Sequence, residues 1–186
     1  MKNTTILLLL LITFSIAGCS SCKKNVDTSS DNPYGLPNAT QEGKNTLGFL
    51  LNGQPWTPKG QVGLSANLAI DLDFGYNNGI LSISSYRSNA NTIEYFAIGV
   101  KDSLNFITSF PVNMLLRNGT LGNSRFSNGS CSIDYNNTSV YRDGNLRISK
   151  LDKIAKIISG TFNVTLYKNG CTDTIRITEG RFDMKF

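Results

Sequence analysis

The side chains that most often carry out catalysis are unevenly represented in this chain of 186 residues. It contains no histidine, so a Ser-His-Asp triad, a Cys-His dyad and a histidine-based zinc site are excluded. A pair of carboxylates could still serve glycoside hydrolysis. The candidates for such a pair are Asp71, Asp73, Glu94, Asp134, Asp152 and Asp183. Their spacing marks no two of them as partners, so we expect solvated charges and treat a carboxylate-based hydrolase as an unfavoured alternative.

Metal and cofactor sites have no clear signature in the sequence. The acidic stretch at residues 71–82 is spaced like a calcium loop, but Gly75 and Ser82 stand where such loops need an oxygen ligand and a glutamate. The glycine–lysine loop that cradles phosphate is absent from the sequence. We therefore expect no metal site and no cofactor.

The N-terminus has the organisation of an export signal. Lys2 is followed by an apolar run over residues 6–16, interrupted by Thr13 and Ser15. A membrane-spanning helix needs about 20 apolar residues, so this run is too short to span and has the length of a signal-peptide apolar region.

The residues after the run, Ile16-Ala17-Gly18-Cys19, resemble the bacterial lipobox. In that family the cysteine thiol receives a diacylglycerol, the chain is cut before the cysteine, and the new amino group is acylated. The resemblance implies a signal peptide at 1–18 and a mature chain lipidated at Cys19. Residues 19–45 are polar and read as a flexible tether. We expect the N-terminal lipid to hold the protein at the outer membrane. The sequence does not decide between the periplasmic face and the surface face of that membrane.

Two further cysteines, Cys131 and Cys171, each lie on or beside an expected strand. Exported proteins meet oxidising conditions, so the two could form a disulfide. Such a bond would stabilise the fold by about 4 kcal/mol if its effect is loop closure alone. Two buried free thiols are the alternative, because the sequence does not show that the cysteines approach each other.

The only tryptophan, Trp56, follows an Asn-Gly turn at residues 52–53. Its ring is a candidate ligand contact, since aromatic faces stack against sugars. Small β-domains more often place a lone tryptophan in the core, where it buries a large apolar area. We favour the core and keep ligand contact as the alternative.

The segments that must position these residues read as strands. Asn-Gly pairs recur at 52–53, 78–79, 118–119, 128–129 and 169–170, with Asp-Gly at 143–144, and such pairs favour hairpin turns. Between them apolar residues alternate with period two, as in a strand with one buried face. The expected strands are 47–51, 62–74, 80–87, 93–100, 130–135, 145–151, 158–166, 173–178 and 181–186. Residues 46–186 are thus predicted to be one all-β domain, an antiparallel β-sandwich or flattened barrel of about nine strands.

Two places leave the strand pattern ambiguous. Residues 151–158 have apolar positions at helical spacing, although we favour a hairpin connection. At Gly180 the apolar phase shifts, which indicates either a bulge in one long strand or the turn of a last hairpin. We favour the bulge.

Two stretches near the ends of the expected domain contain recognisable motifs. The first is LPNATQEGKNTLG at residues 36–48, followed by LNGQPW at 51–56. The second combines SGTF at 159–162 with GRFD at 180–183. Together these motifs resemble those of a family of uncharacterised bacterial outer-membrane lipoproteins. The resemblance implies a lipid-anchored β-domain, and the family carries no assigned activity.

The net charge and the export signal limit the classes of partner that we expect. The formal net charge is +5, yet an export signal places the chain outside the cytoplasm, so we expect no nucleic-acid partner. The absence of catalytic patterns favours a non-enzymatic binding or assembly module with an unknown protein or glycan partner. A glycan- or small-ligand-binding module, suggested by Trp56, the tyrosines and the asparagine-rich loops, is the main alternative.

Overall fold

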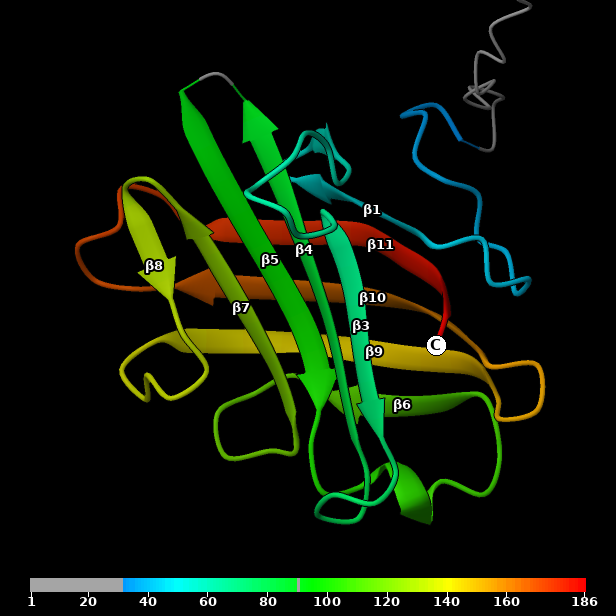
Figure 1. Ribbon diagram of the computed structural model, residues 1–186. Helices are drawn as coiled ribbons and strands as arrows, with labels where there is room; N and C mark the ends of the chain where they lie inside the picture. The colour runs from blue at the N-terminus through cyan, green and yellow to red at the C-terminus, as the bar shows by residue number, and fades with distance from the viewer. Residues whose placement is uncertain (1–31, 90) are drawn as a thin grey trace, which may run out of the picture.

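A computed structural model describes residues 32–89 and 91–186, which form two antiparallel β-sheets packed face to face (Figure 1). The six-stranded sheet has the order β2 (Gln54–Trp56), β1 (Thr46–Leu51), β11 (Ile175–Lys185), β10 (Ile157–Tyr167), β9 (Tyr141–Asp152) and β6 (Val112–Leu115). The five-stranded sheet has the order β3 (Leu68–Asp73), β4 (Ile80–Asn89), β5 (Thr92–Val100), β7 (Gly122–Asn128) and β8 (Cys131–Ile133). The predicted β-sandwich is confirmed, and the sheets do not close into a barrel.

The predicted signal peptide at 1–18 and the lipidation site Cys19 lie outside the described residues. The described residues contain no helix long and apolar enough to cross a membrane. Their one short helical segment is η1 (Leu104–Phe106).

The core follows from strand alternation, because every second side chain of each sheet faces the other sheet. On β4 the buried positions alternate with half-exposed ones, whereas β5, whose last five residues are all buried, lies in the centre of its sheet. Aromatic rings from both sheets meet in the middle of the sandwich. The ring centroids of Phe49 and Phe96 are 4.7 Å apart, and those of Phe96 and Phe162 are 5.4 Å apart.

The strand predicted at 62–74 is wrong in its first half, because only β3 forms. Gly63 has φ +63°, and Val62 and Ser65 face each other across a tight turn. The side chain of Leu64 is consequently fully exposed. The alternating pattern of residues 62–66 arises in a loop and does not report a buried face.

Three strands of the described residues were not expected: β2, β6 and β7. Conversely, Asp143-Gly144 makes no turn, since both residues lie inside β9 and pair with β10. The Asn-Gly pair at 118–119 leads from β6 in one sheet to β7 in the other, so it belongs to a crossover loop and not to a hairpin.

At both ambiguous places, residues 151–158 and Gly180, the structure has the arrangement that the sequence favours. Residues 153–156 form a tight turn between β9 and β10, in which the Asp152 carboxylate accepts hydrogen bonds from the amides of Ile154 and Ala155. At Gly180 the register of β11 shifts against both neighbouring strands, and Glu179 has φ +53°. This is a bulge in one continuous strand.

The expectation of a flexible tether over 19–45 does not hold for residues 32–45. Asn32 and Leu36 are buried, and Pro37 lies against Gly48 on the outer face of β1. The backbone of residues 42–44 is bonded to a carboxylate of β11. The ordered domain therefore begins before the boundary at residue 46 that composition predicts.

Cys131 and Cys171 are joined by a disulfide, with their Cα atoms 5.3 Å apart. Cys131 opens β8 of the five-stranded sheet, and Cys171 lies in the loop between β10 and β11. The bond therefore links the two sheets at one end of the sandwich.

Candidate functional site

The candidate acidic residues of the sequence are occupied mostly in holding the fold together. Asp134 forms an ion pair with Arg125, and Asp73 accepts a hydrogen bond from the amide of Gly75. Asp152 closes the β9–β10 turn, as described above. Asp71 is exposed on the outer face of β3. The structure brings no two of the six candidates into a shared ion pair or hydrogen bond within the described residues.

Asp183 is the most heavily bonded of these acids, and it is only 1% exposed. Its carboxylate accepts hydrogen bonds from the hydroxyls of Thr40 and Ser159 and from three successive backbone amides, those of residues 42–44. Burial alone would raise the pKa of Asp183, but the bonds from Thr40, Ser159 and the backbone lower that pKa to about 2. The carboxylate thus clamps the N-terminal segment onto the outer face of the six-stranded sheet.

Trp56 is fully buried, so its ring offers no face to a ligand. It stacks on Phe49 with ring centroids 4.6 Å apart, and its indole N–H donates to Glu94 over 2.8 Å. The same Glu94 oxygen accepts a hydrogen bond from Arg87 over 2.7 Å. The core position favoured from sequence is the one observed, and candidate ligand contact at Trp56 has no support in this geometry.

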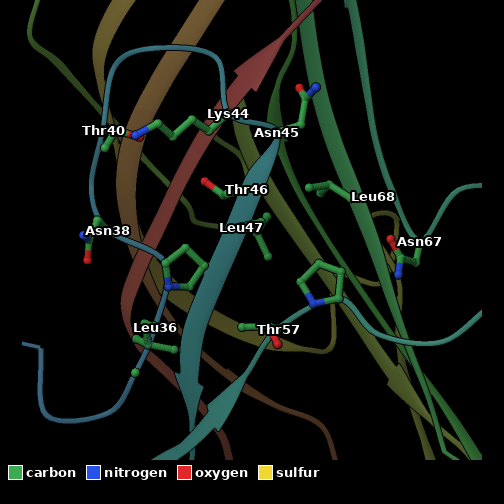
Figure 2. A pocket seen from close by; sticks show the side chains of 13 residues that line it. Leu36, Asn38, Thr40, Lys44, Asn45, Thr46, Leu47, Thr57, Asn67 and Leu68 are labelled. Carbon is green, nitrogen blue, oxygen red and sulfur yellow. The ribbon is translucent and has the colours of Figure 1, made fainter. Parts of the chain in front are cut away.

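The larger concave feature, here called the edge groove, has a volume of about 540 Å³. Figure 2 shows its walls: the segment with Leu36, Asn38 and Lys44 lies on one side of β1, and Asn67 and Leu68 lie on the other. Pro37 and Pro58 add apolar surface, and the remaining polar groups are amides and hydroxyls. None of the lining residues, all of them within the described ranges, is acidic.

A second concave feature, here called the loop pocket, has a volume of about 400 Å³. It is built from Lys101 and Asp102 after β5, from residues 117–121 between β6 and β7, and from residues 135–138 between β8 and β9. The amide of Lys101 donates to the carbonyl of Leu121, and the Asn118 side chain donates to the carbonyls of Thr138 and Val140. These bonds hold the separate loops in one arrangement.

Arg142 of β9 stands behind the loop pocket and is only 5% exposed. Its guanidinium donates to the carbonyls of Ser124 and Asp134 and to the side-chain oxygen of Asn118. Burial lowers the pKa of Arg142, yet an arginine stays charged at neutral pH. All three acceptors are uncharged, so this buried cation has no anionic partner among the described residues.

Beside the loop pocket, tyrosines gather on the outer face of the five-stranded sheet. Tyr86 and Tyr95 face each other across β4 and β5 with ring centroids 4.8 Å apart, and the guanidinium of Arg125 lies 4.8 Å from the Tyr95 ring. Burial, and then the neighbouring Tyr135 hydroxyl, raise the pKa of Tyr95 to about 12. Tyr135 also lines the loop pocket, so the tyrosine cluster and the pocket are continuous.

Sequence reasoning did not find either pocket or this cluster. The alternation of side chains along a strand places Tyr86 and Tyr95 on the outer face, so the sequence could have predicted this cluster. The loop pocket had no such signal, because its residues come from segments up to about 40 positions apart in the chain.

Comparison with protein-family models, with curated proteins and with solved structures finds no match for this chain. The resemblance to outer-membrane lipoproteins therefore rests on the sequence motifs alone.

Proposed function

We propose that this protein is a lipid-anchored lipoprotein of the bacterial outer membrane, whose β-sandwich is a non-enzymatic binding module for another envelope protein. Acyl chains on Cys19 hold it at the bilayer, since two or three chains bind far more persistently than one. Residues 20–31 connect this anchor to the clamped segment that begins at Asn32.

The observation that carries the binding role is the free edge of β3 beside the edge groove. β3 is the outermost strand of its sheet, and no other strand of the described residues pairs with its second side (Figure 1). Its first residue, Leu68, lines the groove. Such an edge accepts an extended segment of a partner protein as an additional strand, with the groove receiving the partner's side chains.

The backbone direction of β3 supports this role. The carbonyl of Asn67 accepts a hydrogen bond from the amide of Tyr86 on β4. Because backbone groups of an antiparallel strand alternate in direction, those of Leu68, Ile70 and Leu72 point away from β4. Their side chains are only half-buried against the core, so a docked strand would also cover apolar surface.

The charge on the outer face of β3 selects the partner. Asp71 and Asp73 are exposed there, and the edge groove adds no acidic residue. A second copy of this strand would place aspartates against aspartates, which is unfavourable. The partner segment is therefore basic, with Lys or Arg at alternate positions.

The non-enzymatic character is supported by the roles of the acids. Asp183, Glu94, Asp134 and Asp152 each bind structural donors, as described above. Removing any of them from those donors would cost stability, which argues against their use as acid or base.

The test is site-specific photocrosslinking in cells that make the full lipidated protein. A photoreactive residue at Ala69, which is exposed on β3, should give one crosslinked product of defined mass. Ile70→Pro should abolish that product, because proline removes an N–H at the free edge, while edge strands tolerate proline. Ile70→Val is the matched control and should retain the product.

A photoreactive residue at Thr161, exposed in the middle of the six-stranded sheet, sets the background. Thermal unfolding of each purified variant checks that the fold is intact. Equal products from Ala69 and Thr161, or a product that survives Ile70→Pro, would contradict a strand-edge partner.

A further inference from the structure

We infer that the loop pocket binds an acidic sugar residue of the uronate class, with the sugar carboxylate facing Arg142 and Lys101. This ligand site is separate from the edge of β3 and goes beyond the proposed protein partner. The pocket is lined by residues of the loops after β5, β6 and β8.

The charge of the pocket calls for an anion. Buried charged groups are normally paired, since an unpaired charge in a poorly solvated site is costly. Arg142 is buried on uncharged acceptors, and three of its five N–H donors are used by them. Lys101 is exposed at the same pocket and forms no ion pair within the described residues. Arg117 is neutralised by Asp143, and the carboxylate of Asp102 offsets one of the two other cations, so Arg142 and Lys101 leave the pocket with one excess positive charge.

The remaining lining groups fit a sugar better than a bare anion. Asn136 and Thr138 are exposed and supply donors and acceptors for hydroxyl groups. Leu121 is 44% exposed and Tyr135 is 36% exposed, and both offer apolar contact to the ring of a sugar. A volume of about 400 Å³ is at the lower end of the range for small-molecule sites.

Asp102 adds a second sign of a binding site. It has φ +56°, in the left-handed region, and backbone strain of this kind concentrates at ligand sites. One of its carboxylate oxygens is shielded from solvent and has no hydrogen-bond partner among the described residues. Asp102 therefore keeps acceptor capacity that the fold itself does not use.

The tyrosine cluster extends the pocket in one direction. Tyr135 belongs to the pocket wall, and Tyr95 and Tyr86 continue from it over the outer face of the five-stranded sheet. Further sugar residues of a glycan chain could lie along this surface, so an oligosaccharide should bind more tightly than one sugar.

The experiment is titration calorimetry of the purified mature protein with a tetramer of galacturonic acid. The matched ligand is the same tetramer after reduction of its carboxyl groups, which keeps the hydroxyls and removes the charge. We expect binding of the acidic tetramer to be about 10-fold tighter than that of the neutral one, as charge-assisted bonds require. Equal affinity for the two, or no binding at millimolar acidic tetramer, would overturn the inference.

Variants separate this site from general charge attraction. Arg142→Lys would disturb the bonds that Arg142 makes to Ser124, Asn118 and Asp134, so the deciding variant is Lys101→Gln, because the Lys101 side chain is exposed. It should weaken binding of the acidic tetramer by about 5-fold. Arg147→Gln removes the same charge from the exposed face of β9 in the other sheet and should leave affinity unchanged. Equal losses in both variants would show unspecific attraction and overturn the inference. Photocrosslinking from Ala69 stays intact in Lys101→Gln if the strand-edge function is correct, so the two proposals fail separately.

Discussion

Replacing Asp183 by asparagine should release the N-terminal segment and destabilise the domain. The carboxylate accepts five hydrogen bonds, three of them from the backbone of residues 42–44. An amide keeps one acceptor oxygen and turns an N–H₂ group toward buried donors, which leaves at least one backbone amide without a partner.

The magnitude follows from the pKa of Asp183, which is lowered from 3.8 to about 2. One pKa unit corresponds to about 1.4 kcal/mol, so the charged form stabilises the folded state by about 2 kcal/mol at neutral pH. For a domain of this size a loss of about 2 kcal/mol lowers Tm by about 4–8 °C. Opening of residues 32–45 should accompany the loss, and hydrogen exchange of their amides should speed up.

The pH dependence gives this prediction its sharpest form. A carboxyl whose pKa is lowered in the folded state contributes stability above its unfolded pKa and loses it as the pH falls through the folded value. Urea unfolding of wild type and Asp183→Asn should therefore differ at pH 7 and converge between about pH 4 and pH 2. A difference that is independent of pH, or a variant as stable as wild type at pH 7, would refute this account of the clamp.

Three further predictions concern stability. Changing Cys131 and Cys171 to serine should lower the free energy of unfolding by about 4 kcal/mol in the chain-entropy model, and reductant should lower the Tm of wild type but not that of the double variant. Gly180→Ala should destabilise by about 2 kcal/mol, since the added Cβ would overlap the Phe162 ring, and urea unfolding should show it. Trp56→Phe should cost about 2 kcal/mol by removing buried volume and an indole hydrogen bond, and an unchanged Tm would contradict its core position.

The strands that the sequence predicts well are those in which alternation reports a buried face. β4 and β10 follow their alternating apolar pattern closely, because each is flanked by strands on both sides and packs its apolar face against the other sheet. β7 was missed, since its inward positions include Gly122 and Ser124 and give no apolar signal. The strand expected at 62–66 does not form, although apolar residues alternate there. The bend at Gly63 takes this stretch out of the sheet, so the alternation does not correspond to a buried face.

The clamp and the loop pocket depend on contacts that composition does not encode. Residues 32–45 look like a tether because they are polar, yet Asp183 binds three of their backbone amides from 139–141 positions away. Arg142 reads as one of many basic strand residues until the topology places it behind three loops. Sequence could predict the class of each strand, but not which loops share one end of the sandwich.

The most direct test of the proposed lipid anchor is mass spectrometry of the N-terminal peptide from protein isolated out of its native membranes. Lipidation at Cys19 predicts a mature chain that begins at Cys19, with a diacylglycerol on the sulfur and an acyl group on the amino nitrogen. A chain that begins elsewhere, or one that begins at Cys19 with a free thiol and a free amino group, would contradict it.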